Sequence, residues 1–347
     1  MAWAGSITLI NEELMGKRRF ILTHELAPGD VVASTALVRD IKLKYGREVE
    51  VDFRTNMDAV YEHNPYLTPL RDNDASSEHI TLCYGRGITA AGREKVHFTT
   101  WFHRDFNNKS GLDVTPRHSK PDLHLTEYEK DNPPITGRYW LVLGGGKMDM
   151  TTKHWDYGRY QEVIDRLRPY GLRFVQSGAL KKGHIHPPLG NVLNIVGWGY
   201  IRQLMWQVYH AEGVICPITC AMHMAAAFDK PCVVIAGGRE EPWWEAYVDD
   251  YGAFGLDAEN VPVPHRYLHT LGLLDCCETK GCWRKKTVKI SDDTNVCHRP
   301  VTSITSEQVI PDCMDMITTD HVVEAVMSYY LDGTLPPIGQ PKNMATL

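Results

Sequence analysis

The chain lacks any hydrophobic run approaching the roughly 20 residues that a membrane-spanning helix needs. It also lacks the basic region followed by an apolar run that marks a secretory signal, because residues 1–5 read Met-Ala-Trp-Ala-Gly. No lipidation motif is present. We therefore expect a cytoplasmic protein with no membrane span.

A surplus of basic residues is missing as well. The 347 residues include 37 Lys and Arg against 43 Asp and Glu, which gives a formal net charge of −6. A dedicated nucleic-acid binder needs a basic surface, so this balance disfavours nucleic acid as a partner. The length and the hydrophobic content of 43% are typical of a globular protein with two domains of ordinary size.

Two common nucleotide-binding fingerprints, the Walker A loop and GxGxxG, are absent because the required spacings do not occur. Instead, an apolar run over residues 139–143 leads into three consecutive glycines, 144–146, and then into Thr151, Thr152 and Lys153. Glycines let a backbone approach an anion closely, and a helix N-terminus attracts phosphate. The stretch predicts an anion site; the alternative is a glycine-rich turn with a solvated lysine.

Strand and helix patterns alternate along most of the chain, which predicts parallel sheets covered by helices on both faces. A proline-rich stretch over residues 117–138 separates two such halves and predicts a two-domain α/β protein with a cleft between the domains. Strands are predicted over residues 18–23, 49–53, 80–84, 139–143, 172–177, 192–195, 213–216 and 231–236. Helices are predicted over residues 32–45, 157–169, 200–210, 219–228 and 320–330.

Several short motifs, taken in order, resemble those of glycosyltransferase family 9, the ADP-heptose-dependent heptosyltransferases. They are Pro-Gly-Asp-Val-Val at 28–32, Thr-Thr-Lys-His-Trp at 151–155, and the segments 213–227 and 230–235. The resemblance implies the GT-B arrangement, in which two Rossmann-like domains face a cleft. We expect an acceptor domain over 1–135, a nucleotide-sugar domain over 136–264, a cysteine-rich insertion over 265–315, and a C-terminal helix and tail over 316–347.

The resemblance implies an inverting glycosyltransferase that moves a sugar such as heptose from a nucleoside-diphosphate donor, with an ADP-linked donor favoured. The acceptor hydroxyl could belong to a glycan, a protein or another molecule, no catalytic metal is expected, and the oligomeric state is open. Two alternatives stay open from the residues: a nucleotide-sugar epimerase of the same architecture, or a degenerate transferase that acts as a metal-stabilised binding module. The second arises because Ile218 and Cys220 stand where the family motif has aspartate and glycine.

By the same resemblance, Asp30 falls on the acidic residue at the acceptor side, where it would act as the base, and Lys153 on a lysine that would neutralise the departing diphosphate. An ordinary helix cap is the alternative for Asp30, and a surface lysine is the alternative for Lys153. The residues expected to bind the donor are Gly144, Gly145, Thr151, Thr152, Lys153, Gln176, Ser177, Thr219, His223 and Glu240.

Five of the nine cysteines fall between residues 276 and 313, in a stretch rich in charge and poor in apolar residues. Such a stretch cannot bury enough surface to fold unaided, and clustered thiols in a cytoplasmic protein favour a metal over disulfides. We expect Cys276, Cys282, Cys297 and Cys313 to bind a structural zinc or iron ion, with Cys277 as a spare. The spacing also resembles part of the iron-finger pattern of the autotransporter heptosyltransferase branch, although the fourth cysteine lies further downstream. A redox-active disulfide and a set of free thiols are the alternatives.

Overall fold

Two parallel sheets organise the structure, a computed structural model that describes residues 17–247, 263–289 and 294–338. The first sheet has three strands in the order β2-β1-β3, and both neighbours run parallel to the central strand. Alternate residues of the central strand, Phe20 and Leu22, are completely buried and form the core of this half. The strands are β1 (Arg18–Thr23), β2 (Val49–Arg54) and β3 (Ser77–Thr81).

The second sheet has six parallel strands in the order β11-β10-β9-β4-β6-β8. Its central strands are buried on both faces, which explains their continuous apolar sequence. Because all the strands are parallel, their carboxyl ends meet at one edge of the sheet, where ligands bind in open α/β proteins. The strands are β4 (Trp140–Val142), β6 (Phe174–Gln176), β8 (Leu193–Asn194), β9 (Gly213–Pro217), β10 (Cys232–Gly237) and β11 (His265–His269).

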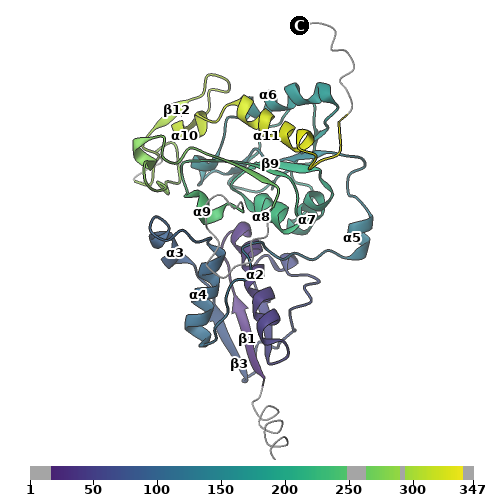
Figure 1. The fold of residues 1–347 in the computed structure, drawn as a ribbon, viewed down its shortest axis with the longest axis vertical. Helices are drawn as coiled ribbons and strands as arrows, with labels where there is room; N and C mark the ends of the chain where they lie inside the picture. The colour runs from purple at the N-terminus through teal and green to yellow at the C-terminus, as the bar shows by residue number, and fades with distance from the viewer. Residues whose placement is uncertain (1–16, 248–262, 290–293, 339–347) are drawn as a thin grey trace, which may run out of the picture.

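Helices cover both faces of the second sheet (Figure 1). Helices α6 and α11 lie on the outer face, whereas α7 and α8 lie between this sheet and the first domain. The helices are α2 (Pro28–Tyr45), α3 (Gly85–Ala90), α4 (Thr99–Ser110), α5 (Glu127–Asp131), α6 (Tyr157–Leu167), α7 (Ile201–His210), α8 (Cys220–Ala227), α9 (Pro242–Glu245), α10 (Asp312–Asp315) and α11 (Thr319–Leu331). Two short antiparallel pairs complete the structure, β5 (Gly146–Lys147) with β7 (His184–Ile185) and β12 (Pro300–Thr302) with β13 (Val309–Pro311).

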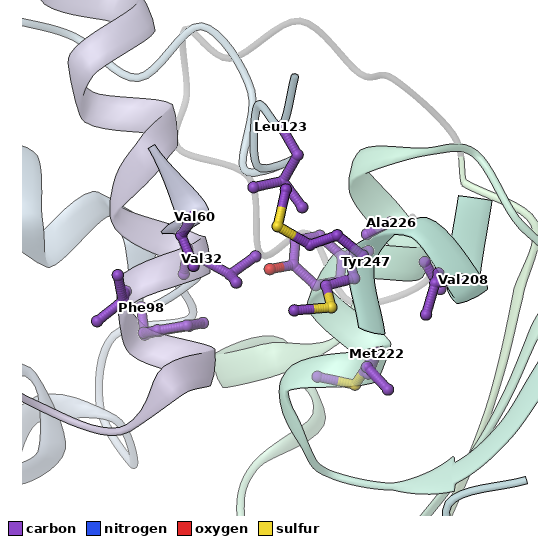
Figure 2. Close-up of a cluster of buried hydrophobic side chains, with 14 of the residues drawn as sticks. Val32, Val60, Phe98, Leu123, Val208, Met222, Ala226 and Tyr247 are labelled. Carbon is purple, nitrogen blue, oxygen red and sulfur yellow. The ribbon is translucent and has the colours of Figure 1, made fainter. Parts of the chain in front are cut away.

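The two halves meet through α2 and α8, and one hydrophobic cluster runs through the contact (Figure 2). Val32 of α2 and Met222 of α8 are both completely buried. Gly29 allows a close approach of the two helices, because a Cβ on this residue would lie 2.9 Å from the His223 ring. The expected cleft is therefore closed by packing where α2 and α8 touch.

The fold confirms the predicted α/β class with two parallel sheets, while the ends of several elements differ from those predicted. The third strand ends at Thr81 rather than at 84, because it pairs with β1 and β1 ends at Thr23. Helix α2 begins at Pro28 rather than at 32, since proline fits the first position of a helix. Strand β11, which was not predicted, pairs with β10 and extends the second sheet to His269. Among the described residues, no helix is both long and apolar enough to cross a bilayer.

Candidate functional site

Asp30 lies in the first turn of α2, at the contact between the two halves. Its Oδ2 accepts a hydrogen bond from the Ala27 backbone N–H at 3.1 Å, and its Oδ1 accepts one from the Tyr84 hydroxyl at 3.1 Å. Burial raises the pKa of Asp30 to about 6, and the negative charge of Glu245 adds to this effect. Asp30 therefore caps the helix and is also a carboxylate whose pKa lies close to neutral pH, which suits a general base.

Lys153 ends a short 3₁₀ helix, η2 (Thr151–Lys153), that follows the glycine-rich loop. Its Nζ lies 3.0 Å from Oε1 of Glu240, which also pairs with the Arg239 guanidinium. Burial lowers the pKa of Lys153 to about 8. The negative charge of Glu245 partly opposes this lowering. Two cations thus lie beside one buried carboxylate at the carboxyl edge of the second sheet.

His223 lies in α8, and its ring packs against Gly29 across the contact between the two halves. Its Nδ1 shares a hydrogen bond of 2.7 Å with the Tyr247 hydroxyl. Burial holds the pKa of His223 well below its ordinary value, so the imidazole is neutral. Thr219 is the N-cap residue of α8, and its hydroxyl is buried without a hydrogen-bond partner among the described residues.

Glu245 joins these groups into one site, which sequence reasoning did not find. Its Oε2 lies 4.0 Å from His223 Nε2, and its charge acts on Asp30, Lys153 and Arg239. It comes directly after the stretch 239–244, whose two carboxylates and two tryptophans mark the sheet edge in the sequence, so its position was a usable signal. We call Asp30, Lys153, His223, Glu240 and Glu245 the interdomain site.

The hydroxyls of Thr151 and Thr152, which were predicted to bind the donor, are already hydrogen-bonded to other parts of the protein. Thr151 Oγ1 accepts a hydrogen bond from the Thr287 backbone N–H at 2.9 Å, and Thr152 Oγ1 donates one to the Arg284 carbonyl at 2.6 Å. The Thr152 N–H also donates to the Lys285 carbonyl. These residues hold the cysteine-rich segment, and their contact with a donor stays a prediction.

The other predicted donor residues at this edge also have protein partners. Gln176 bonds the 187–189 loop through both ends of its amide, and the Ser177 hydroxyl donates to the Gln207 side chain at 2.8 Å. Gly144 packs against the Tyr160 ring. A Cβ on Gly145 would lie 2.0 Å from the Ile185 carbonyl oxygen, so this glycine accommodates strand β7. Their roles toward a donor stay predictions.

The five clustered cysteines converge although they come from different elements. All of them line one cavity of about 10 Å³, about the volume of one water-sized sphere. His298 also lines this cavity, but its Nε2 is already bonded to Arg284. Burial and the neighbouring thiols raise the pKa of the four cysteines predicted as ligands. We call the five cysteines, Cys276, Cys277, Cys282, Cys297 and Cys313, the thiol cavity.

The side chains of the thiol cavity do not yet form a metal site in this structure. Within residues 17–247, 263–289 and 294–338, no three His, Cys, Asp or Glu side chains are arranged so that they could hold a metal ion. Facing one cavity requires less than lying at ligand distance, so the five thiols converge on one point without defining a coordination geometry.

Two Rossmann-like halves, joined at the sheet edge that carries these charged groups, form the GT-B arrangement, which glycosyltransferases that use a nucleotide-sugar donor share with nucleotide-sugar epimerases. The sequence comparison names the family: the model of glycosyltransferase family 9 (heptosyltransferase) matches residues 70–267, and the chain belongs to this family. No curated protein matches the chain.

Solved structures share the fold at low sequence identity. A family 9 glycosyltransferase from Veillonella parvula is 12% identical over 92% of this chain and 98% of its own, with a TM-score of 0.59. The iron-containing dodecameric glycosyltransferase TibC from enterotoxigenic E. coli is 16% identical over 91% and 77%, also with 0.59. The E. coli ADP-heptose LPS heptosyltransferase II is 14% identical over 91% and 99%, with 0.53. At these identities the likeness concerns the fold.

Proposed function

We propose that this glycosyltransferase inverts the anomeric centre of a sugar that it takes from a nucleoside diphosphate, with ADP-linked heptose as the favoured donor. The observation that carries the proposal is the interdomain site, where a carboxylate from the first domain lies in the same charged cluster as a lysine from the second. ADP-heptose is the donor named for the E. coli heptosyltransferase II. The acceptor is a hydroxyl of a glycan, a protein or another molecule.

Asp30 is the proposed base. The acceptor hydroxyl gives its proton to the Asp30 carboxylate while its oxygen forms a bond to the anomeric carbon. On the opposite face of that carbon, the bond to the diphosphate oxygen breaks, and the electron pair leaves with the nucleoside diphosphate. The Tyr84 hydroxyl and the Ala27 N–H orient Asp30, and each occupies one lone pair, so the carboxylate retains acceptor capacity for the proton.

Lys153 is the proposed partner of the leaving diphosphate. Its ammonium group lies at the carboxyl edge of the second sheet, beside Arg239, and at neutral pH it carries the charge that a departing phosphate needs. Glu240 Oε1 lies 3.0 Å from this ammonium group and orients it.

We also propose that Cys276, Cys282, Cys297 and Cys313 hold a structural zinc or iron ion. The donor set fits, because four thiols that face one cavity of atomic size are the ligands that both metals take in tetrahedral sites. The similar fold of TibC belongs to an iron-containing protein. A bound metal would supply folding energy to this segment, whose residues 281–287 contact η2 and the Arg239 loop.

We propose the four domains expected from the sequence, 1–135, 136–264, 265–315 and 316–347, with strand β11 of the second sheet at the start of the third. We propose a cytoplasmic enzyme without a nucleic-acid partner.

Calorimetry with ADP, UDP and GDP tests the donor half of this proposal. The wild-type protein should bind one of them, and Lys153→Ala should weaken that binding by about 10- to 100-fold, the range for a hydrogen bond to a charged group. Lys17→Ala is the matched control, since Lys17 is an exposed lysine at the opposite end of β1 from Asp30. A protein that binds none of the three nucleotides, or for which both variants behave alike, would contradict the proposal.

A further inference from the structure

Glu245 presents a buried carboxylate oxygen that the protein leaves unpaired. The residue ends α9 with only 12% of its side chain exposed, and its Oε2 has no hydrogen-bond partner among the described residues. Leaving a buried acceptor unpaired is costly, and more so when it is charged, so a group from outside the protein, a water or a ligand, must complete it. The site it faces is the interdomain site, which rests on the function proposed above.

The neighbourhood of Glu245 defines what this ligand must offer. His223 Nε2 lies 4.0 Å away, which is too long for a direct hydrogen bond. One hydroxyl oxygen placed between these atoms can lie within about 2.8 Å of both, because the O–H can donate to the carboxylate while the oxygen accepts from the imidazole. His223 can supply that N–H when its Nδ1 accepts from Tyr247, as their 2.7 Å contact permits.

Charge separates the two ends of the site. A carboxylate accepts hydrogen bonds and repels phosphate, whereas a sugar presents several O–H donors. The cations Lys153 and Arg239 are therefore the end for the diphosphate, and Glu245 with His223 is the end for hydroxyl groups. Asp30 carries a further negative charge near Glu245 and is assigned to the acceptor.

We propose that Glu245 is a specificity-determining residue of the transfer reaction, which binds a hydroxyl group of the donor sugar together with His223. The alternative is that Glu245 serves only as a counter-charge that positions Lys153. The two roles differ in a way that can be measured: a sugar contact acts only on the intact donor, whereas a counter-charge acts equally on the donor and on the free nucleotide.

Two variants and two ligands test this assignment. Glu245→Gln, which keeps the shape of the side chain, and Lys153→Ala are titrated by calorimetry with the free nucleoside diphosphate that binds and with its nucleotide sugar, using ADP-heptose for ADP, UDP-glucose for UDP or GDP-mannose for GDP. We expect Glu245→Gln to bind the free diphosphate as the wild type does and to bind the nucleotide sugar about 10- to 100-fold more weakly. Lys153→Ala should weaken both ligands by a similar factor.

The contrary outcomes are distinct. Equal weakening of both ligands by Glu245→Gln, or no change in either, overturns the sugar contact and leaves the proposed function standing. A wild-type protein that binds no nucleotide sugar overturns both. Because a variant could lose affinity through misfolding, Glu245→Asp serves as a second probe with a shorter carboxylate, and unchanged binding of the free diphosphate shows that both Glu245 variants are folded. Monodeoxy donors complete the test: for at least one, removing the hydroxyl should cost the wild type as much as Glu245→Gln does and should cost the variant almost nothing further. Additive losses for every deoxy donor would also overturn the assignment.

Discussion

The interdomain site and the thiol cavity are both clusters of ionisable side chains, yet the fold holds them in different ways. The interdomain site lies between α2 and α8 and is bordered by buried aromatic residues such as Phe98 and Trp244. The thiol cavity lies in a segment that contributes few buried apolar residues and is attached by backbone hydrogen bonds. Packing thus fixes the first cluster, whereas the second depends on its attachments and, as proposed, on a metal.

The two regions meet at Arg239. Its Nε donates to the Arg284 carbonyl at 2.5 Å, its backbone carbonyl accepts from the Trp283 N–H at 3.0 Å, and its guanidinium pairs with Glu240. Gly281 lies so close that a Cβ there would be 2.5 Å from the Arg239 carbonyl oxygen. A disturbance of the thiol cavity should therefore reach the diphosphate end of the interdomain site before it reaches Asp30.

The largest effect should come from Asp30→Asn, which removes the proposed base and keeps the shape of the side chain. We expect transfer to fall by about 10²- to 10⁴-fold, the range for general-base catalysis. The free energy of unfolding should instead rise in this variant. Because the pKa of Asp30 is raised to about 6 in the folded protein, ionisation of this group destabilises the fold as pH rises from about 4 to 6, and the loss persists at higher pH.

Removing that charge should raise the free energy of unfolding at pH 7.5 by about 1–2 kcal/mol, less than the full pKa difference because Asp30 is partly solvated and loses hydrogen bonds. Thermal melts at pH 7.5 and pH 4 check this, since the gain should vanish at the lower pH. Asp131→Asn, an exposed carboxylate at the end of α5, is the control and should alter neither rate nor melting. An Asp30→Asn enzyme with normal transfer would exclude Asp30 as the base.

The pH profile of transfer should depend on one titrating group at each end of the interdomain site. Asp30 must be ionised and Lys153 must be protonated, so kcat/KM should rise through about pH 6 and fall through about pH 8. Below about pH 6 and above about pH 8, kcat/KM should change about tenfold per pH unit. Lys153→Arg should remove the alkaline limb, since arginine stays charged at that pH. A profile that is flat between pH 5 and 9 would show that neither group titrates in the reaction.

Much of the fold could be predicted because it follows from local patterns. The strands at 18–23 and 213–216 are apolar runs between turns, and the helix at 157–169 shows one apolar face, so each was placed within a few residues. The order of alternating elements then determines parallel sheets. The short third strand was misplaced because its end depends on its partner β1, which lies more than 50 residues away.

The site was harder to predict because its contacts are long-range. Thr152 bonds Arg284, 132 positions away, and nothing near Thr152 in the sequence indicates that its hydroxyl is already used. Glu245 was missed for the same reason, since its burial depends on the packing of the first domain against α9. Asp30 and Lys153 were predicted from short motifs, which give the positions of residues in the chain but not their partners, and their roles stay predictions.

The smallest effect on transfer should come from Cys297→Ser, which removes one proposed metal ligand and tests how far the two regions are independent. Metal analysis of the purified wild-type protein should find one zinc or iron ion per chain, and the variant should lose it. Because residues 281–287 contact η2 and the Arg239 loop, donor affinity should fall, by about three- to tenfold, whereas the acid limb of the pH profile, which belongs to Asp30, should stay at the same pH. Cys83→Ser is the matched control, since Cys83 is an exposed cysteine of the first domain.

If metal were absent from the wild-type protein and all the thiols of the cavity reacted freely, the cavity would be held by its hydrogen bonds alone. If instead Cys297→Ser moved the acid limb, the two regions would be one cooperative unit, and the contrast between a site built by packing and a site built by attachment would be wrong.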